Sequence, residues 1–248
     1  MSKICLITGA SSGIGQACAR IFSQNGYHLI LLARRKDRLL DLQKELPNPT
    51  LILQADVRDL NQVGLAIDSL PDSWKNIEVL INNAGLAAGL SPIDQGSLDD
   101  WEQMIDTNVK GLLYVSRKVI PLMKNLGKGH IFNISSTAGK EVYAQGNVYC
   151  ATKHAVDALS KAMRIDLLDK QIKVTNIAPG MVETEFSLVR FKGDSQRAAQ
   201  VYTGLKPLQG SDVAQVIFFA TTLPDHVNIN DLTLTATAQA NSFYSVRK

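Results

Sequence analysis

The stretch Thr8-Gly9-Ala10-Ser11-Ser12-Gly13-Ile14-Gly15 follows an apolar run at residues 4–7 and precedes a helical pattern that begins at Gln16. Glycines let the backbone turn sharply and approach a pyrophosphate, while the free N–H groups and positive end of a helix stabilise an anion. The spacing is a variant of the dinucleotide-binding fingerprint, and its place between a strand and a helix favours that interpretation over a tight turn without a ligand. The candidate binding residues are Gly9, Ser11, Ser12, Gly13, Ile14 and Gly15.

The rest of the chain repeats this strand-then-helix order. Short β-rich runs occur at residues 4–8, 28–33, 50–54, 77–81, 130–135, 173–178 and 230–237. Helical periodicity fills most of the gaps, and the longest helical stretches are 101–125 and 147–168. This alternation predicts an α/β fold, a doubly wound (Rossmann) parallel sheet of about seven strands with helices on both faces. The absence of a linker predicts a single domain over residues 1–248.

The least regular stretch lies at about residues 180–210, where a short helix is predicted near 195–202. A long connection after a strand of such a sheet is typical of a substrate lid.

Composition excludes several other classes of protein. The chain has 26 basic and 23 acidic residues with interspersed signs, so no stripe indicates binding to nucleic acid or to a membrane. The three cysteines form no Cys-x-x-Cys pair, and the four histidines are scattered without the spacing of metal ligands. The cysteine and histidine spacings therefore predict no metal site. No charged leader or long apolar run is present, so we expect a cytoplasmic protein.

The end of the second strand indicates which nucleotide binds. The segment Ala33-Arg34-Arg35-Lys36 has no acid for a ribose 2′-hydroxyl and offers arginines for a 2′-phosphate, which favours NADP over NAD. Three cations at the start of a helix also oppose its dipole, a conflict that a phosphate would relieve. A solvated basic turn is the alternative.

Further candidates follow the third and fourth strands, whose carboxyl ends border the ligand crevice of such a fold. For Asp56 the alternative is an acid at a helix N-terminus. These additional candidates for cofactor binding are Asp56, Val57, Asn83, Ala84 and Gly85.

Tyr149 and Lys153 stand four residues apart in a helical stretch, and Ser136 lies thirteen residues upstream of the tyrosine. The four-residue spacing puts the phenol and the ammonium on one helix face, where the cation favours the phenolate. Such a tyrosine can move protons. Taken singly, each residue has an ordinary alternative: a partly buried aromatic, a solvated lysine, and a cap or turn serine.

As an ordered set, these motifs resemble the short-chain dehydrogenase/reductase family over essentially the whole chain. The matching positions are Thr8-Gly9-x-x-x-Gly13-x-Gly15, Asn82-Asn83-Ala84-Gly85, Asn108, Ser136, Tyr149-x-x-x-Lys153 and Pro179-Gly180. The resemblance implies that Tyr149 is the general acid/base, that Ser136 orients the substrate oxygen, and that Lys153 binds the nicotinamide ribose and lowers the pKa of Tyr149. It also implies that Asn108 holds a water of a proton relay.

The same resemblance extends the cofactor site to Pro179, Gly180, Val182 and Thr184, and it places Tyr149 and Lys153 there as well. It further implies a homotetramer, with the helical stretches 101–125 and 147–168 at a subunit interface. The same apolar faces could instead be wholly internal.

Residues 186–194 and 223–230 resemble a narrower branch of NADP-dependent dehydrogenases of serine, allo-threonine and other 3-hydroxy acids, including malonic semialdehyde reductases. The substrate would then be a small hydroxy acid, or the related carbonyl compound, held by Ser136, Tyr149 and a cation at Arg190 or Lys192 that binds its carboxylate. Two alternatives stay open: a reductase of other ketones or aldehydes, and a non-catalytic NADP-sensing or scaffold protein on the same fold.

Overall fold

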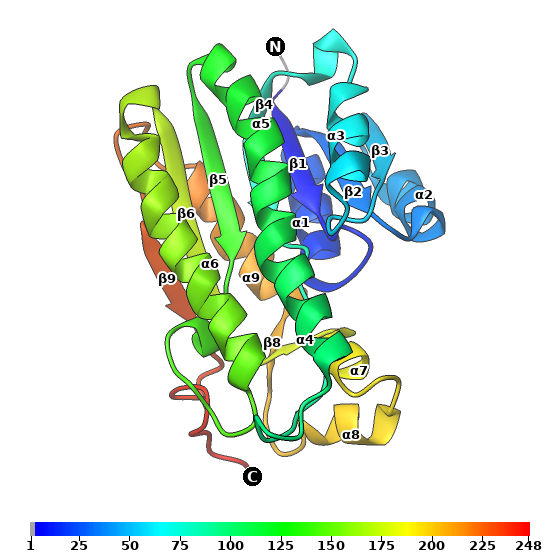
Figure 1. Ribbon diagram of the computed structural model, residues 1–248. Helices are drawn as coiled ribbons and strands as arrows, with labels where there is room; N and C mark the ends of the chain where they lie inside the picture. Colours follow the sequence, from blue (N-terminus) through cyan, green and yellow to red (C-terminus); the bar gives the residue numbers. More distant parts are fainter. Residues whose placement is uncertain (1–2) are drawn as a thin grey trace.

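Seven parallel strands form the central sheet, in the order β3-β2-β1-β4-β5-β6-β9 (Figure 1). The structure is a computed structural model that describes residues 3–248. The strands are β1 Ile4–Thr8, β2 His28–Ala33, β3 Thr50–Gln54, β4 Ile77–Asn82, β5 Gly129–Ile134, β6 Ile172–Pro179 and β9 Asp231–Leu234. All six pairings between neighbours are parallel, so the predicted doubly wound α/β class is confirmed.

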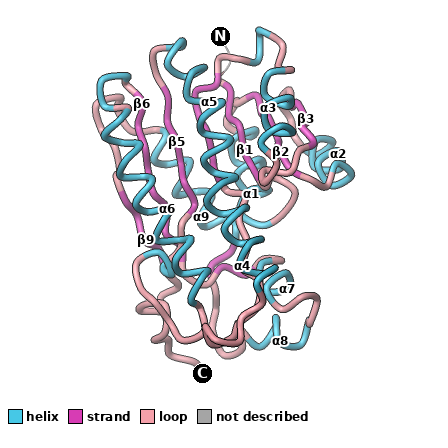
Figure 2. The backbone as a smooth tube through the Cα atoms, viewed as in Figure 1, coloured by secondary structure: helices cyan, strands magenta, loops and turns pink. Residues whose placement is uncertain are grey.

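Helices cover both faces of the sheet because successive residues of a strand point to opposite sides. On β1, Ile4 and Leu6 face one core cluster, whereas Cys5 and Ile7 face the other. The first cluster packs under α3 Leu60–Asp68, α5 Leu112–Leu126 and α6 Asn147–Asp166, and the second under α1 Gly13–Gln24, α2 Lys36–Glu45 and α9 Gly210–Thr221. Figure 2 shows α3, α5 and α6 in front of the strands and α1 and α9 behind them.

The helical stretch predicted at 101–125 is interrupted in the structure. It consists of α4 Leu98–Ile105, the π-helical segment η2 Asp106–Gly111, and α5. Such π-helical turns are frequent at functional sites. Here the turn carries Asn108, whose side chain bonds the loop after β4. The remaining short helices are η1 Asp72–Trp74, η3 Thr137–Gly139 and η4 Leu168–Lys170.

The segment after β6 closes over the carboxyl ends of the strands. Its two short strands, β7 Val182–Glu183 and β8 Leu208–Gln209, pair with each other and enclose α7 Phe186–Arg190 and α8 Ser195–Gln200. The short helix predicted near 195–202 corresponds to α8. The sequence did not predict α7, which is only five residues long. Figure 1 shows α7 and α8 together at this end of the molecule, with the C-terminus nearby.

The C-terminal segment packs against this region. The Lys248 N–H donates to the carbonyl oxygen of Gly204 at 2.9 Å, and an Arg247 guanidinium nitrogen donates to that of Thr203 at 2.7 Å. The tail therefore covers its own chain near the site. Within residues 3–248, no helix has the length and apolarity needed to cross a membrane.

Candidate functional site

A cavity of about 490 Å³ lies at the carboxyl ends of the central strands, where the strand order reverses between β1 and β4. Crevices at this position are the usual ligand sites of open α/β sheets. Most residues predicted from the sequence line it: Gly9, Ser11, Ser12, Gly13, Ile14, Arg34, Arg35, Asp56, Val57, Asn83, Ala84, Gly85, Ser136, Tyr149, Lys153, Pro179, Gly180, Val182, Thr184 and Arg190. Gly15, Asn108 and Lys192 lie outside the lining.

The glycine loop forms an open cradle at one end of the cavity. Gly9 and Gly13 have φ values of +64° and +55°, a conformation that side chains disfavour. A Cβ on Gly15 would lie 2.5 Å from the carbonyl oxygen of Gly9, so this position shapes the loop without lining the cavity. The Ser12 side chain makes no capping bond at the start of α1, and the first turn holds no acid. The free N–H groups of this turn can therefore bind a phosphate.

Thr8 and Asn83 hold the glycine loop against the end of β4. The Thr8 hydroxyl accepts hydrogen bonds from the N–H groups of Asn83 and Ala84, both at 3.0 Å. In return, the Asn83 amide donates to the carbonyl oxygens of Thr8 and Gly9 at 3.0 and 3.2 Å. The amide group of Asn83 thus supports the loop. Sequence reasoning quoted Thr8 within the motif but assigned it no role.

Arg35 lies directly beside the glycine loop. Its guanidinium donates to the hydroxyls of Ser11 and Ser12 at 3.2 and 3.0 Å and to the Glu185 carboxylate at 3.0 Å. Arg38, one turn further along α2, bonds the same carboxylate. Neither Arg38 nor Glu185 was predicted at this end of the site, since Glu185 is 147 residues or more from both arginines.

Arg34 and Asp56 lie at the ends of the neighbouring strands β2 and β3. One Arg34 nitrogen is 3.9 Å from a carboxylate oxygen of Asp56, and the Arg58 guanidinium bonds that carboxylate at 2.7 Å. Burial alone would raise the pKa of Asp56, but the hydrogen bonds and charges of Arg58, with the charge of Arg34, lower it below its usual range. The alternative that Asp56 serves as the acid at a helix N-terminus is wrong, because Asp59 caps α3.

Tyr149 and Lys153 lie on the first two turns of α6, with their side chains buried. The Lys153 ammonium donates to the carbonyl oxygen of Ile134 at 2.8 Å and lies 5.9 Å from the centre of the Tyr149 ring. The Ser136 hydroxyl accepts from the Ala138 N–H at 3.1 Å, so it lies where β5 ends and the next turn begins. The helix face predicted from the four-residue spacing is thus turned toward the cavity.

The two adjacent serines have different positions. The Ser135 hydroxyl donates to the Lys153 carbonyl oxygen at 3.0 Å and ties β5 to α6. The Ser136 hydroxyl makes a longer contact of 3.4 Å with the carbonyl oxygen of Pro179. The Ser136 hydroxyl therefore makes the weaker hydrogen bond within the chain and is the more available to a substrate. This supports Ser136, chosen from its spacing to Tyr149, as the serine that orients the substrate oxygen.

Burial governs the ionisation of Tyr149 and Lys153. It raises the pKa of Tyr149 well above its usual value, with a further contribution from Tyr143, and Ser136 and Arg190 oppose it only in part. Burial also lowers the pKa of Lys153 to about 8. In the chain alone, burial outweighs the predicted lowering of the Tyr149 pKa, and the effect of Lys153 in the cofactor complex stays a prediction. At neutral pH this phenol is a proton donor.

Asn108 uses its side chain to bond the loop after β4 and helix α6. Its amide oxygen accepts from the Leu86 N–H at 2.8 Å, and its amide nitrogen donates to the Leu86 carbonyl oxygen at 2.8 Å and to the Thr152 hydroxyl at 3.0 Å. These bonds engage both donor hydrogens of the amide. The side chain thus positions Leu86, which lines the cavity, and the role of Asn108 in holding a water stays a prediction.

Arg190 is the predicted substrate cation that reaches the cavity. Its guanidinium donates to the Tyr143 hydroxyl at 2.7 Å and lies 5.4 Å from the centre of the Tyr149 ring. Lys192 does not line the cavity, because its ammonium pairs with Asp100 at 3.0 Å. Tyr143 and Phe186, whose ring centre is 5.6 Å from that of Tyr149, also line the site and were not predicted.

The C-terminal segment completes the cavity wall with Gln239 and Ser242. The Gln239 amide oxygen accepts from the Met181 N–H at 2.8 Å and packs so closely on Gly180 that a side chain there would collide with it. The Ser242 N–H donates to the Glu141 carboxylate at 2.9 Å. These contacts place the C-terminal segment over the site.

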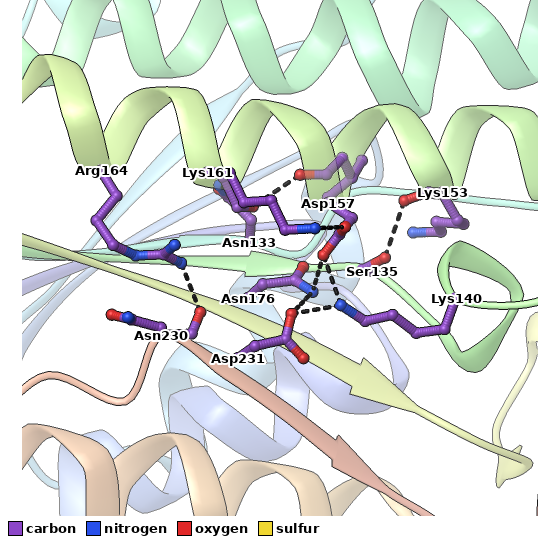
Figure 3. A network of polar contacts seen from close by, with 12 residues as sticks. Asn133, Ser135, Lys140, Lys153, Asp157, Lys161, Arg164, Asn176, Asn230 and Asp231 are labelled. Carbon is purple, nitrogen blue, oxygen red and sulfur yellow. Dashed lines mark hydrogen bonds and ion pairs between the residues drawn. The ribbon is translucent and has the colours of Figure 1, made fainter.

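A polar network joins α6, β6, β9 and the segment after the η3 turn (Figure 3). Lys140, just after the η3 turn, pairs with Asp157 of α6 at 2.5 Å and with Asp231 of β9. The Asn176 amide of β6 donates to both carboxylates, at 3.1 and 2.9 Å. The network joins a helix and two strands to the segment after η3, which follows Ser136 in the chain. It therefore holds this segment in a fixed position relative to α6.

Comparison with known proteins agrees with this geometry. The family described as short chain dehydrogenase matches residues 3–194. The NADP-dependent 3-hydroxy acid dehydrogenase YdfG of Salmonella typhi is 46% identical over 246 residues, 99% of each chain. Sulfoacetaldehyde reductase 2 of Chromohalobacter salexigens is 45% identical over 249 residues, again 99% of each. A solved structure, the closed form of serine dehydrogenase complexed with NADP⁺, has a TM-score of 0.94 and 45% identity over 99% of each chain.

The match to the family and the identity over the full length of these relatives settle the class of protein. The chain belongs to the short-chain dehydrogenase family, and the two relatives named here are a dehydrogenase and a reductase.

Proposed function

We propose that this protein is an NADP(H)-dependent oxidoreductase that interconverts the 3-hydroxyl and 3-oxo groups of small acids such as serine, allo-threonine and 3-hydroxypropionate. The observation that carries the proposal is the convergence of Tyr149, Ser136 and Arg190 on one cavity with the glycine loop at its other end. This places a proton donor, a hydroxyl and a cation around one small volume.

The cofactor end has features that suit a phosphorylated dinucleotide. Gly9 and Gly13 line the cavity, where a pyrophosphate could approach their backbone, and the first turn of α1 offers uncapped N–H groups. Arg35 lies beside Ser11 and Ser12 and would bind the 2′-phosphate, with Arg34 at the neighbouring edge. When bound, the nicotinamide supplies or accepts the hydride. The NADP-dependent relative and the serine dehydrogenase complexed with NADP⁺ agree with this assignment.

The chain's own residues would handle the proton. In the direction of reduction, Tyr149 donates its phenolic proton to the substrate oxygen, and the Ser136 hydroxyl donates a hydrogen bond as negative charge develops there. In the direction of oxidation, the phenolate must first form. Lys153, 5.9 Å from the ring centre, then favours the ionised phenol.

Arg190 would select the substrate class. A guanidinium that borders the reacting centre binds a carboxylate through charge-assisted hydrogen bonds, and Tyr143 fixes its orientation. A sulfonate offers similar acceptors, and the similarity to a sulfoacetaldehyde reductase favours small sulfonates as a second candidate. An uncharged ketone or aldehyde would leave the guanidinium without this partner.

The assembly and the location in the cell are further parts of the proposal. Ile165 and Leu168, at the end of α6 and just beyond it, are 76% and 77% exposed, and Leu113 of α5 is also exposed. Apolar residues on these two helices support a homotetramer with both at a subunit interface. Light scattering of the purified protein tests this assembly. We also propose that the protein is cytoplasmic, which fractionation of cells would test.

A substrate panel tests the proposed activity. We expect NADP⁺ reduction with L-serine, L-allo-threonine or 3-hydroxypropionate, and kcat/KM lower by at least about tenfold with NAD⁺ because the arginines lose the 2′-phosphate. Faster turnover of small sulfonates would favour the second candidate. NADP⁺ binding without turnover across acids, sulfonates, ketones and alcohols would instead indicate a sensor or scaffold.

A further inference from the structure

Glu185 lies between two arginines at the cofactor end of the cavity. One carboxylate oxygen accepts a hydrogen bond from Arg35 at 3.0 Å, and the other accepts from Arg38 at 2.5 Å. Burial alone would raise the pKa of Glu185, but Arg38 and Arg35 together lower it below its usual value. The carboxylate is therefore ionised at neutral pH and neutralises part of the local positive charge.

The same Arg35 guanidinium bonds the hydroxyls of Ser11 and Ser12 in the glycine loop. A 2′-phosphate held by Arg35 would lie next to the Glu185 carboxylate, which would repel it. Guanidinium groups bind carboxylates and phosphates through the same planar donors, so the two anions need the same hydrogen-bonding positions.

We propose that the Glu185 carboxylate is an internal anion that competes with the 2′-phosphate of NADP(H) for Arg35 and Arg38, and thereby limits the preference for NADP(H) over NAD(H). The inference rests on the proposed cofactor assignment. Since NAD(H) lacks the 2′-phosphate, Glu185 lowers the affinity for one dinucleotide and leaves that for the other nearly unchanged.

Glu185 also lies close in the chain to the substrate end of the cavity. It directly precedes α7, and Arg190 is the last residue of that five-residue helix. One short helix therefore borders both the Arg35 end of the cavity and the Tyr149 end.

Isothermal titration of the full chain with NADP⁺ and with NAD⁺ tests the proposal on Glu185→Gln. Removing a like charge next to a phosphate should lower the Kd for NADP⁺ about tenfold and change the Kd for NAD⁺ less than about twofold. The gain should shrink at high ionic strength, because salt screens partly exposed charges. Glu183→Gln is the matched control: its carboxylate accepts from the Gln209 amide at 2.9 Å and, within residues 3–248, pairs with no arginine.

An unchanged ratio of the two Kd values in Glu185→Gln, or weaker NADP⁺ binding, would overturn the competition. An equal decrease in the Kd for NADP⁺ in Glu183→Gln would also overturn the competition. General repulsion between the cofactor and nearby carboxylates would then explain the change in both variants. The proposed function fails separately, if the unmodified protein binds NAD⁺ as tightly as NADP⁺.

Discussion

The Arg190 guanidinium donates a hydrogen bond to the Tyr143 hydroxyl at 2.7 Å, and this pair forms the substrate end of the cavity. Arg190 comes from α7 and Tyr143 from the loop before α6, so the pair also joins the closing segment to the helix that carries Tyr149. A cation fixed in this way is available to an anion on a small substrate.

Replacing Arg190 by Met should lower kcat/KM for L-serine by about 100-fold, because a charge-assisted hydrogen bond is lost. An uncharged small aldehyde should lose less than about threefold, since it never used the guanidinium. Steady-state kinetics on both substrates measures the difference. Lys192→Met, which removes a lysine paired with Asp100 outside the cavity, is the control and should change neither value. Equal losses on both substrates in Arg190→Met would argue against an anion site.

Gly15→Ala should weaken NADP⁺ binding by at least about tenfold, because the added Cβ cannot fit against the glycine loop without moving it. The collision is with the Gly9 carbonyl oxygen, 2.5 Å from the new carbon. Titration of nucleotide fluorescence gives the affinity. Gly64→Ala in α3 is the control, since its Cβ would make an ordinary 3.5 Å contact with the Lys118 side chain. Normal affinity in Gly15→Ala would show that the loop does not hold the cofactor.

Asn108→Ala should lower the free energy of unfolding by about 3 kcal/mol, because the buried Leu86 backbone groups and the Thr152 hydroxyl lose their partner. Urea denaturation measures this change. Asn147→Ala offers a comparison: its amide donates to the Ser91 carbonyl oxygen at 2.9 Å and accepts from the adjacent Val148 N–H at 2.7 Å, and its loss should cost only about 1 kcal/mol. If Asn108→Ala has full stability and loses only activity, the positioning role is wrong and a relay role is favoured.

The buried Lys153 should make stability depend on pH. Its pKa is about 8 in the folded chain, whereas an unfolded lysine titrates near ~10.4. Below pH ~8 the folded state bears the whole cost of the buried charge, and between ~8 and ~10.4 that cost disappears because the unfolded chain binds more protons. The wild-type protein should therefore gain stability relative to Lys153→Met as the pH rises over this window, by on the order of 1–3 kcal/mol.

Urea denaturation of both proteins at pH 7 and pH 10 measures this Lys153 effect. The exposed Lys206→Met variant provides the control and should show no comparable change between the two pH values. A difference between wild type and Lys153→Met that is the same at both pH values would contradict the buried-charge account.

Much of the fold could be predicted because the strands are strongly buried. The bounds of β1, β2 and β3 agree with the predicted runs, since each is a compact apolar segment between turn residues. The last strand was predicted too long: β9 ends at Leu234, and its exposed residues alternate with partly buried ones. Local patterns also cannot distinguish a π-helical turn from α-helix, which is why η2 was missed.

The site was predictable where a motif lies within one segment. The glycine loop and the Tyr149–Lys153 spacing are local patterns with a physical reason. The Glu185 carboxylate, in contrast, is brought to Arg35 and Arg38 only by the closing segment. Tyr143 reaches Arg190 from 47 residues away, and no spacing rule connects them. The burial that raises the pKa of Tyr149 could not be predicted from the sequence, because it depends on residues contributed by several elements.

The most direct test of the proposed chemistry compares the wild-type protein with Tyr149→Phe. We expect NADP⁺ reduction by the wild-type protein with L-serine or another small 3-hydroxy acid, and a loss of kcat in the variant of about 10³-fold, since the proton donor and acceptor is removed. NADP⁺ affinity, measured by titration, should stay within about threefold, because the phenyl ring keeps the packing. Turnover by Tyr149→Phe at the wild-type rate would contradict the role assigned to Tyr149.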